Sequence, residues 1–361
     1  MFSNIVTNST RVFNFVLYNI QFRRFSSIMS NKSLKIGTHD GQFHCDEALA
    51  CYLLKKLDEY KDAEIVRTRN PDKLADCDIV VDVGAIYDHD KKRYDHHQRE
   101  FAHSLKSLDI SLPYVTKLSS AGLIYYHYGE GIIRNELKKA GMENLTRCLF
   151  IKMYENCIEE VDAVDNGISI AEGTTRYKCN SAISSRISFL NPRWNEESSP
   201  EDSDKRFESA MKLVGEHFDD RLDYYITSWI PARSIVESAF HDRFKAHESG
   251  EILVFTKGCC PWKEHLTELE EEEGVGDLVK FVLFTDQHGH WRVQSVPKEV
   301  NSFESRIPLH QDWRGLRDDV LSQVSGIDSC IFVHASGFIG GNKTYEGAIK
   351  MALNTIKAVN Q

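Results

Sequence analysis

Short apolar runs alternate with amphipathic segments through the first half of the chain. Apolar runs at residues 34–37, 63–68 and 78–84 predict three strands, and the pattern of residues 46–57 predicts a helix after the first strand. The third run has a continuous apolar centre, which is typical of a buried parallel strand. Strand and helix patterns in alternation therefore predict a doubly wound α/β domain with a mostly parallel sheet.

A second, smaller α/β pattern occupies the C-terminal part of the chain. Its strands are expected at residues 251–255, 279–285, 291–296 and 330–333, and its helices at 262–273, 313–321 and after 342. The second and third of these strands form a predicted hairpin. The polar segment 191–204 is typical of a loop, and a long helical pattern follows it. We therefore predict a catalytic domain at residues 31–190, a linker and helical connection at 191–250, and a substrate-binding domain at 251–361.

Length, charge and cysteine usage narrow the class of protein. A chain of 361 residues exceeds the size of one typical hydrophobic core. It lacks a run of about 18 apolar residues, so we expect no membrane span. The net charge of −10 argues against a protein that binds nucleic acid through its overall charge. Any nucleic-acid contact must therefore rest on a local basic patch or on metal-bound phosphate. The nine cysteines are scattered without a CxxC pattern, which predicts reduced thiols.

The N-terminal segment has the composition of a targeting sequence. Its first 39 residues contain no Asp or Glu, but they hold Arg11, Arg23 and Arg24 among apolar, Ser and Thr residues. This composition predicts a mitochondrial presequence over residues 1–30, and a disordered tail is the alternative. Met29 is a second possible start, which would yield a form without the presequence.

Histidines and acidic residues gather where the predicted strands of the first domain end. His39, His44 and Asp46 lie between the first strand and its helix, and Asp82 closes the third strand. Ligands of open α/β sheets bind at the carboxyl ends of the strands. Imidazole and carboxylate together suit Mn, Fe, Zn or Co. The alternatives are a polar loop that caps the helix and, for Asp82, a capping carboxylate at the strand end.

Two further stretches add groups of the same kind. Asp95, His96 and His97 are consecutive, and a solvated polar turn is the alternative for them. In the acidic helical segment after residue 152, Asp162 and Asp165 lie three residues apart and share one face of the helix. Both aspartates remain candidates for one ligand position. The accumulation of these groups at the ends of one predicted sheet indicates a metal centre.

Two segments have the pattern of a phosphate contact. Ser119 and Ser120 predict a capped helix start, where packing is the favoured role and anion binding the alternative. A predicted strand that ends at Val333, a Gly-rich loop and a helix would place backbone N–H groups against a phosphate. The candidate substrate residues are His334, Ser336, Gly337, Gly340, Gly341, Arg306, Arg314 and Arg317.

Together these stretches resemble the DHH phosphoesterase superfamily, and more closely the melanocyte-proliferating-gene-one family of eukaryotic 3′–5′ RNA exonucleases. The strings that carry the resemblance are Gly37–Gly41, Tyr94–Gln98, Glu160–Gly167, Pro261–His265 and His334–Gly341. The resemblance runs from about residue 34 to the C-terminus. In the first motif His44 stands where the superfamily usually has Asp, which retains a metal ligand but changes its type.

The resemblance implies a metal-dependent 3′–5′ exonuclease that acts on single-stranded RNA in the mitochondrial matrix and the nucleus. It implies two Mn²⁺ ions, with Mg²⁺ or Zn²⁺ as alternatives, and a bridging hydroxide that attacks phosphorus. The implied ligands are His39, His44, Asp46, Asp82, His96 and either Asp162 or Asp165. Among them Asp82 would bridge both metals. His97 would contact the scissile phosphate or protonate the leaving oxygen, and Asp95 would orient the histidines.

Three other hypotheses stay open at this point. The first is a small-molecule phosphoesterase or pyrophosphatase with the same metals, and the second is a non-catalytic metal- or nucleotide-binding protein with the same fold. The third is a thiol hydrolase that uses Cys45, whose pKa a helix start would lower. A cleft long enough for several nucleotides, with stacking aromatic residues, would favour the nuclease. The sequence carries no signal for an oligomeric state.

The presequence generates the first prediction. Residues 1–30 fused to a fluorescent reporter should direct it into mitochondria, because their Arg-bearing, acid-free composition suits the import machinery. A fusion that begins at Met29 and continues into residue 40 should remain outside the organelle. Co-localisation with a matrix marker measures both. A reporter with residues 1–30 that stays entirely cytosolic would refute the presequence.

Overall fold

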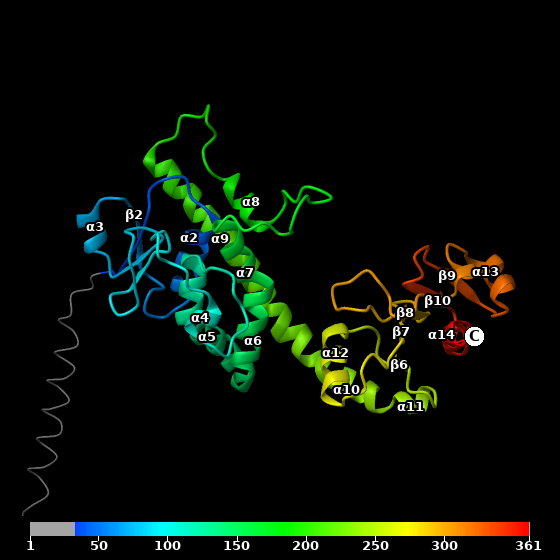
Figure 1. Ribbon diagram of the computed structural model, residues 1–361. Coiled ribbons are helices and arrows are strands. Elements are labelled where there is room, and N and C mark those ends of the chain that lie inside the picture. Colours follow the sequence, from blue (N-terminus) through cyan, green and yellow to red (C-terminus); the bar gives the residue numbers. More distant parts are fainter. Residues whose placement is uncertain (1–32, 361) are drawn as a thin grey trace, which may run out of the picture. The chain divides into compact units, whose positions relative to one another are not determined.

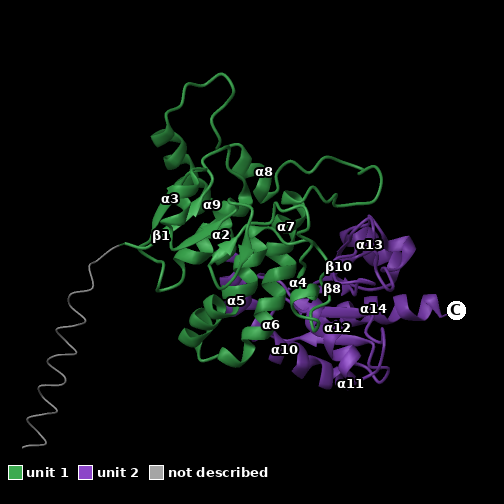
Figure 2. Ribbon diagram, turned by 60° about the vertical axis from the view of Figure 1, so that its left-hand side comes forward, with its two compact units in different colours: residues 1–219 green, residues 220–361 purple. Residues whose placement is uncertain are grey.

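The computed structural model describes residues 33–360, so the predicted presequence lies outside the described residues (Figure 1). The chain divides into two compact units, residues 1–219 and 220–361 (Figure 2). The division falls inside helix α9 (Pro200–Tyr224). Within residues 33–360, every helix is too short or too polar to cross a lipid bilayer.

Unit 1 is built on a five-stranded sheet with the strand order β2-β1-β3-β5-β4. Its strands are β1 (Lys35–Thr38), β2 (Glu64–Arg67), β3 (Ile79–Val81), β4 (Tyr87–Asp88) and β5 (Arg93–Tyr94). The pairs β1–β2, β1–β3 and β3–β5 are parallel, and only the edge strand β4 runs antiparallel. The prediction of a mostly parallel sheet is therefore confirmed for this unit. As a consequence β1, β3 and β5 all end at the same edge of the sheet.

Two helices pack against each other beside this sheet. Helix α2 (Cys45–Lys55) follows β1 directly, and α5 (Ser120–Ala140) lies against it. Ser119 caps α5 by accepting a hydrogen bond from the N–H of Gly122, and Gly141 ends the helix at φ 70°. The remaining helices are α3 (Pro71–Ala75), α4 (Leu105–Leu108), η1 (Glu143–Leu145), α6 (Thr146–Met153), η2 (Tyr154–Ile158), α7 (Glu159–Asp165) and α8 (Ile183–Ser188).

Unit 2 contains a second five-stranded sheet with the order β6-β7-β8-β10-β9. Its strands are β6 (Ile252–Phe255), β7 (Phe281–Thr285), β8 (Trp291–Ser295), β9 (Cys330–Val333) and β10 (Ile339–Asn342). Only β6 and β7 are parallel, and β7 and β8 form the predicted hairpin. Its helices are η3 (Tyr225–Trp229), α10 (Ile230–His241), α11 (Arg243–Ala246), α12 (Lys263–Glu272), η4 (Gln311–Trp313), α13 (Asp318–Ser325) and α14 (Tyr345–Val359).

Alternation along β7 gives this sheet an apolar core on each face. Phe281 and Leu283 join a cluster that includes Met351 of α14, whereas Val282 joins a second cluster with Phe240 of α10. Successive side chains of a strand point to opposite faces, so one strand contributes to both clusters. The mixed α/β class predicted for this part of the chain is therefore confirmed.

Two local predictions in unit 2 are wrong. The helix expected from residue 313 begins only at Asp318. The Gly-rich segment does not form a loop that leads into a helix: Gly340 and Gly341 lie in β10, hydrogen-bonded between β8 and β9. Glycine in a strand often marks a close approach of neighbouring atoms. A Cβ at Gly340 would lie 2.8 Å from the Leu309 side chain and 3.1 Å from a backbone oxygen.

This close packing generates the second prediction. Gly340→Val should destabilise the protein by about 1–3 kcal/mol, the usual cost of overpacking a core. Urea unfolding measures the change. Gly131→Ala is the control, because a Cβ at Gly131 meets no atom within 4 Å and α5 favours alanine. Unchanged stability in Gly340→Val, with weaker substrate binding, would instead return this glycine to the substrate site.

Candidate metal centre in unit 1

The candidate metal ligands converge because their strands are parallel. His39 follows β1, Asp82 follows β3, and His96 and His97 follow β5. The carboxyl ends of these strands share one edge of the sheet. Asp46 comes from the first turn of α2, which begins beside the same edge. The structure thus brings together residues from three predicted stretches of the sequence.

Asp82 occupies the centre of this cluster. Its Oδ2 atom lies 3.4 Å from His39 Nε2, and its Oδ1 atom lies 3.4 Å from His96 Nε2 and 3.5 Å from His97 Nδ1. The backbone of Asp82 has φ 57°, a left-handed conformation that is strained for a non-glycine residue. Burial favours its neutral form, but hydrogen bonds with His39 and His96 hold the pKa of Asp82 well below its usual range. One carboxylate therefore faces two groups of imidazoles.

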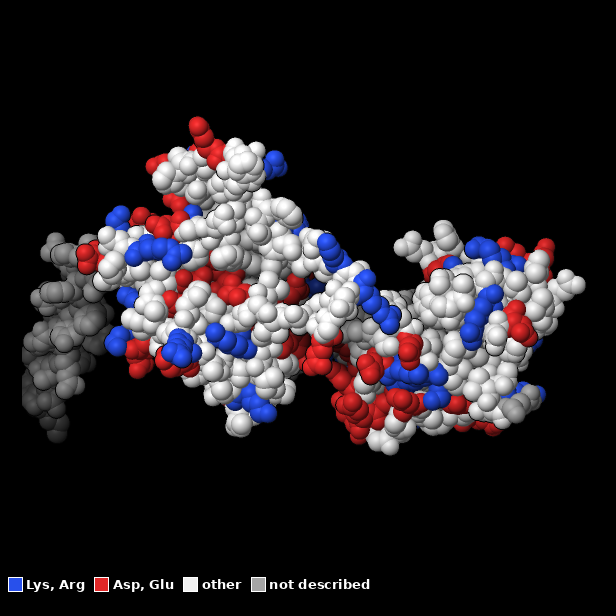
Figure 3. All heavy atoms as spheres, turned by 45° about the horizontal axis from the view of Figure 1, so that its top comes forward, with Lys and Arg blue, Asp and Glu red and all other residues white. Residues whose placement is uncertain are grey.

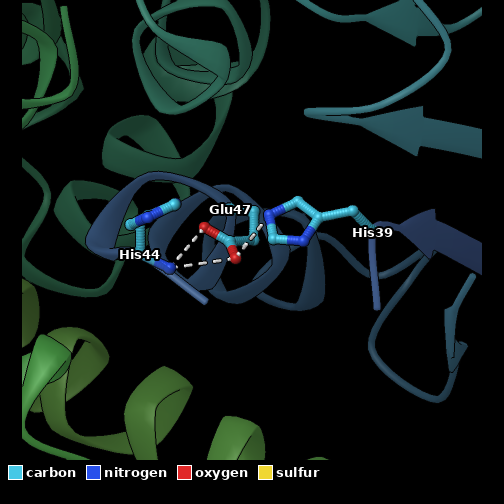
Figure 4. A group of neighbouring side chains, drawn as sticks. All are labelled: His39, His44 and Glu47. Carbon is cyan, nitrogen blue, oxygen red and sulfur yellow. Dashed lines mark hydrogen bonds and ion pairs between the residues drawn. The ribbon is translucent and has the colours of Figure 1, made fainter. Parts of the chain in front are cut away.

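Glu47 is a member of the centre that the sequence analysis missed. Its Oε1 atom lies 3.0 Å from His39 Nε2, and both of its oxygens accept the N–H of His44 at 3.0 Å (Figure 4). Although burial lowers it, the pKa of His39 rises to about 9 through hydrogen bonds with Asp82 and Glu47. His39, His44 and Glu47 form one group with ligand spacing. The sequence signal that could have revealed Glu47 is its place at the third position of the helix. A Glu there commonly accepts the backbone N–H of the N-cap residue, here His44.

A second group surrounds His96. Its Nε2 atom lies 3.0 Å from Asp165 Oδ2 and 3.8 Å from Asp46 Oδ2. Although burial lowers it, the pKa of His96 rises to about 11 through hydrogen bonds with Asp165 and Asp82. Burial, together with the charges of Asp82 and Asp165, raises the pKa of Asp46 well above its usual range. His96, Asp46 and Asp165 therefore attract positive charge strongly.

The N-terminus of α5 does bind an anion, but that anion is a side chain of the protein. The carboxylate of Asp46 accepts the N–H of Ser120 at 3.1 Å and the N–H of Ala121 at 2.5 Å. Free N–H groups and the helix dipole stabilise a negative charge at this position. The helix start therefore positions Asp46, and the N–H groups of Ser120 and Ala121 are already used by this carboxylate.

The structure separates Asp162 from Asp165. Asp162 is fully buried and accepts hydrogen bonds from Ser119 N–H at 2.9 Å, Ser119 Oγ at 2.8 Å and the Tyr154 hydroxyl at 3.1 Å. Burial raises the pKa of Asp162 to about 7. Asp165, one helical turn later, points to His96. Of the two open candidates, Asp165 has ligand spacing, and Asp162 joins α7 to the start of α5.

Asp95 positions His97. Its Oδ1 atom accepts His97 Nδ1 at 2.8 Å and the His97 N–H at 3.1 Å, while Oδ2 accepts the N–H of Ala85 at 2.6 Å. The hydrogen bond with Asp95 raises the pKa of His97. The side chain of His97 is 61% exposed, in contrast to the buried His39 and His96. Together with the exposed His44, it is an imidazole of this cluster that a substrate can reach.

The donor set fits divalent metal ions. Carboxylates of Asp46, Glu47, Asp82 and Asp165 face the imidazoles of His39, His44, His96 and His97, with ligand atoms of each group within 4.8 Å of one another. Both ring nitrogens of His96 are buried: Nε2 has only carboxylates nearby, those of Asp165 and Asp82, and Nδ1 has no hydrogen-bond partner. Buried polar atoms of this kind are costly unless they are paired or coordinate a metal. Imidazole and carboxylate donors together suit a transition-metal ion such as Mn²⁺ better than Ca²⁺.

The centre opens into a cavity of about 1130 Å³ within unit 1. His39, Asp82 and His97 line it together with Arg69 and Phe189. Figure 3 shows acidic side chains inside a hollow on one face of unit 1, while Lys and Arg lie in separate groups around it. A cavity above the roughly 300–1,000 Å³ of common small-molecule sites can hold a substrate of considerable length.

Cys45 does not match the expectation for a nucleophile. Its side chain is buried, with 3% of the residue exposed. Burial raises the pKa of the thiol far above its usual range, whereas a reactive cysteine needs a lowered one. The helix start does not reverse this effect, because Asp46 and Glu47 raise the pKa of Cys45 further. The hypothesis of a thiol hydrolase is wrong.

Among the candidate substrate residues of the Gly-rich segment, those in the turn between β9 and β10 are the accessible ones. His334 and Ser336 are exposed there, and Gly337 has φ 77°. His334 Nδ1 accepts the N–H of Ser336 at 3.1 Å, which fixes the turn. Gly340 and Gly341 lie in β10 and are buried.

The three candidate arginines have different surroundings. Arg306 is buried, and it pairs with Glu270 at 2.8 Å and with Asp277 at 3.0 Å. The Nε atom of Arg314 donates to the backbone oxygen of Leu309 at 2.8 Å. The side chain of Arg317 is 67% exposed. Arg306 thus forms ion pairs within unit 2, and Arg317 is the most accessible of the three arginines.

Comparison with known proteins places these residues in a family. The model MYG1_exonuc, described as "Uncharacterised protein family (UPF0160)", matches residues 35–356. The chain is 56% identical to the "MYG1 exonuclease" of Homo sapiens over 323 residues, covering 89% of this chain and 85% of that protein. It is 49% identical to a "MYG1 protein" of Dictyostelium discoideum over 90% of this chain and 96% of that protein.

A fungal relative extends the same pattern. The "MYG1 protein" of Saccharomyces cerevisiae is 44% identical over 330 residues, covering 90% of this chain and 96% of that protein. No solved structure matches the chain.

The different contacts of Asp162 and Asp165 generate the third prediction. Asp165→Asn should lower the metal content of the purified protein, because Asp165 faces His96. Asp162→Asn should retain the metal, since its amide can still accept from Ser119. Elemental analysis by mass spectrometry measures both variants. Asp162→Ala should instead lower the free energy of unfolding by about 1–3 kcal/mol, because it leaves buried donors unpaired. Equal metal loss in both Asn variants would contradict the assignment.

Proposed function

The chain belongs to the MYG1 family, and we propose that it is a metal-dependent phosphodiesterase that removes nucleotides from the 3′ end of single-stranded RNA. The observation that carries the proposal is Asp82, whose two oxygens face separate groups of imidazoles at the wall of a large cavity. The relatives named exonucleases support the reaction type. The order of the histidine and aspartate motifs supports a place in the DHH phosphoesterase superfamily.

The bound metal would supply a water of lowered pKa and would offset negative charge on the phosphate. We assign His39, His44 and Glu47 to one side of the centre, His96, Asp46 and Asp165 to the other, and Asp82 to both. Two Mn²⁺ ions suit this donor set best.

His97 is the proposed contact for the scissile phosphate or the leaving oxygen. Asp95 holds Nδ1 of His97, which lines the cavity, so Nε2 is the ring nitrogen left for a substrate. Histidine is suited to transfer a proton near neutral pH. Asp95 therefore acts as a positioning residue, and His97 contacts the substrate.

The size of the cavity favours a nucleic acid over pyrophosphate or another small phosphoester. Its volume of about 1130 Å³ lies above the usual range for small-molecule sites. The complete set of donors argues against a non-catalytic protein, since His44 lies close enough to His39 and Glu47 to share a ligand group. We assign the exposed turn of His334 and Ser336, together with Arg317, to contacts with the RNA backbone.

The proposed compartments follow from the N-terminal composition. The acid-free segment before residue 40 supports import into the mitochondrial matrix, and a start at Met29 would leave a form available to the nucleus.

Asp82 generates the fourth prediction. Asp82→Asn should lower the turnover of 5′-labelled single-stranded RNA by several orders of magnitude and should reduce the metal content. The amide has one coordinating oxygen where the carboxylate has two. The fold should survive, because an amide is cheaper to bury than an unpaired carboxylate. Gel electrophoresis of the labelled products also gives the direction of degradation.

Asp88→Asn is the matched control. Asp88 lies in β4 six residues away and pairs with Lys91 at the surface, a contact of small energetic weight. Its substitution should leave turnover and metal content unchanged. Full phosphodiesterase activity in Asp82→Asn, with its metal retained, would reduce Asp82 to a capping residue and remove the proposed mechanism.

A further inference from the structure

One stretch of unit 1 has a charge opposite to that of the whole protein. Residues 173–195 contain four Lys and Arg and no Asp or Glu, whereas the chain carries a net charge of −10. The basic residues are Arg176, Lys178, Arg186 and Arg193, and all are exposed. In the described part of the chain, no carboxylate pairs with the side chains of Arg176, Lys178 or Arg186. This basic segment therefore offers positive charge to an external anion.

The same segment exposes three aromatic side chains. Tyr177 is 80% exposed, Phe189 81% and Trp194 97%. Large aromatic residues at such exposure bury nothing within the protein, and they alternate with the basic residues along the sequence. Aromatic rings beside Arg and Lys are the combination with which proteins bind single-stranded nucleic acid, since bases stack on the rings and phosphates meet the cations.

The basic segment is anchored beside the metal centre. Ile183 and Ile187 are buried on one face of α8, which packs against α2, the helix that carries Asp46. After α8, the side chain of Asn191 accepts the N–H of Phe43 at 2.9 Å and donates to its carbonyl oxygen at 2.7 Å. Phe43 directly precedes His44. The segment is thus tied on both sides to elements that hold metal-centre residues.

The basic segment also forms a wall of the catalytic cavity. Its residues 179–189 contribute Cys179, Asn180, Ala182, Ser184, Ser185, Ser188 and Phe189 to the lining of the cavity that His39 and His97 also line. Phe189 follows the last residue of α8, and extended connections flank this helix (Figure 2). An exposed ring in the wall of the cavity is available to a group that enters the cavity.

We infer that residues 173–195 are the binding platform for single-stranded nucleic acid. Phe189 stacks on the base of the nucleotide that enters the cavity, and Tyr177 and Trp194 stack on bases further along the strand. Arg176, Lys178 and Arg186 contact phosphates. The inference rests on the proposed function, because it names the residues that hold the strand while its end lies at the metal centre. Such contacts read no sequence, so the platform accepts any bases.

The first test measures binding of the full-length protein to a fluorescein-labelled single-stranded RNA of 12 nucleotides, by anisotropy in the presence of a chelator. Phe189→Ala and Trp194→Ala should each weaken binding by about tenfold, the usual effect of removing a stacking ring. Phe189→Tyr should restore the affinity. Phe303→Ala is the matched control in unit 2, because Phe303 is equally exposed and lies outside the basic segment.

Salt dependence tests the basic residues separately. Arg176→Ala and Lys178→Ala should each reduce the slope of log Kd against log salt by about 0.7, the value for one phosphate contact with a single strand. Single-stranded DNA should lose affinity in the same proportion, since stacking does not require the 2′-hydroxyl. A duplex should bind more weakly than either strand, because its bases are already stacked.

Kinetics separates this inference from the proposed function. With Mn²⁺ present, Phe189→Ala should raise KM for the oligonucleotide more than it changes kcat, whereas the control Phe303→Ala should leave both unchanged. Binding that depends on the basic segment without any hydrolysis would sink the proposed function and retain the platform. RNA affinity that is absent in the wild type, or unchanged in a Tyr177, Phe189 and Trp194 triple Ala variant, would overturn the platform and assign these rings to a protein partner.

Discussion

The burial of several carboxylates at one edge of a sheet is the constraint on which unit 1 depends. Asp46, Glu47 and Asp82 are all nearly inaccessible to water, and isolated charges in such positions would be prohibitive. Each is compensated by a different device. Asp46 meets the N-terminus of α5, Glu47 meets the N–H of His44, and Asp82 meets the imidazoles of His39 and His96.

These devices dictate local features of the fold. The start of α5 must approach both Asp46 and Asp162, which explains the small residues there: a Cβ at Gly122 would collide with the carboxylate of Asp162. The strained backbone of Asp82 aims its side chain between the histidines, and the hydrogen bond of its N–H to the Tyr94 carbonyl holds that conformation. Packing between α2 and α5 is therefore inseparable from the geometry of the metal centre.

The sequence predicts the frame of the site better than its details. Strand ends are visible as polar residues after apolar runs, so the convergence of His39, Asp82 and His96 can be foreseen from a parallel sheet. Helical spacing alone cannot choose between Asp162 and Asp165, because both lie on one face and only the position of α5 separates them. Glu47 was not predicted as a metal-centre residue, because an acidic residue in the first turn of a helix is explained by the helix dipole alone.

The prediction of a phosphate-binding loop in the Gly-rich segment of unit 2 was wrong for a related reason. Glycine marks close approach of other atoms, and a pattern cannot tell whether those atoms belong to a phosphate or to the protein itself. At Gly340 these atoms belong to Leu309 and Met351, which are distant in sequence and approach Gly340 only in the folded structure.

An acidic protein can bind a polyanion if its charges are separated in space. In unit 1 the buried carboxylates gather at one edge of the sheet, where the imidazoles of His39 and His96 lie against them. The basic segment exposes Arg176 and Lys178 and has no Asp or Glu between residues 173 and 195. Fields of exposed charges decay within about 8–10 Å at ordinary salt, so a phosphate near the segment responds to these cations and not to the net charge of −10. The net negative charge therefore disfavours binding of nucleic acid over the whole surface. The local arrangement of charges determines where a single strand can bind.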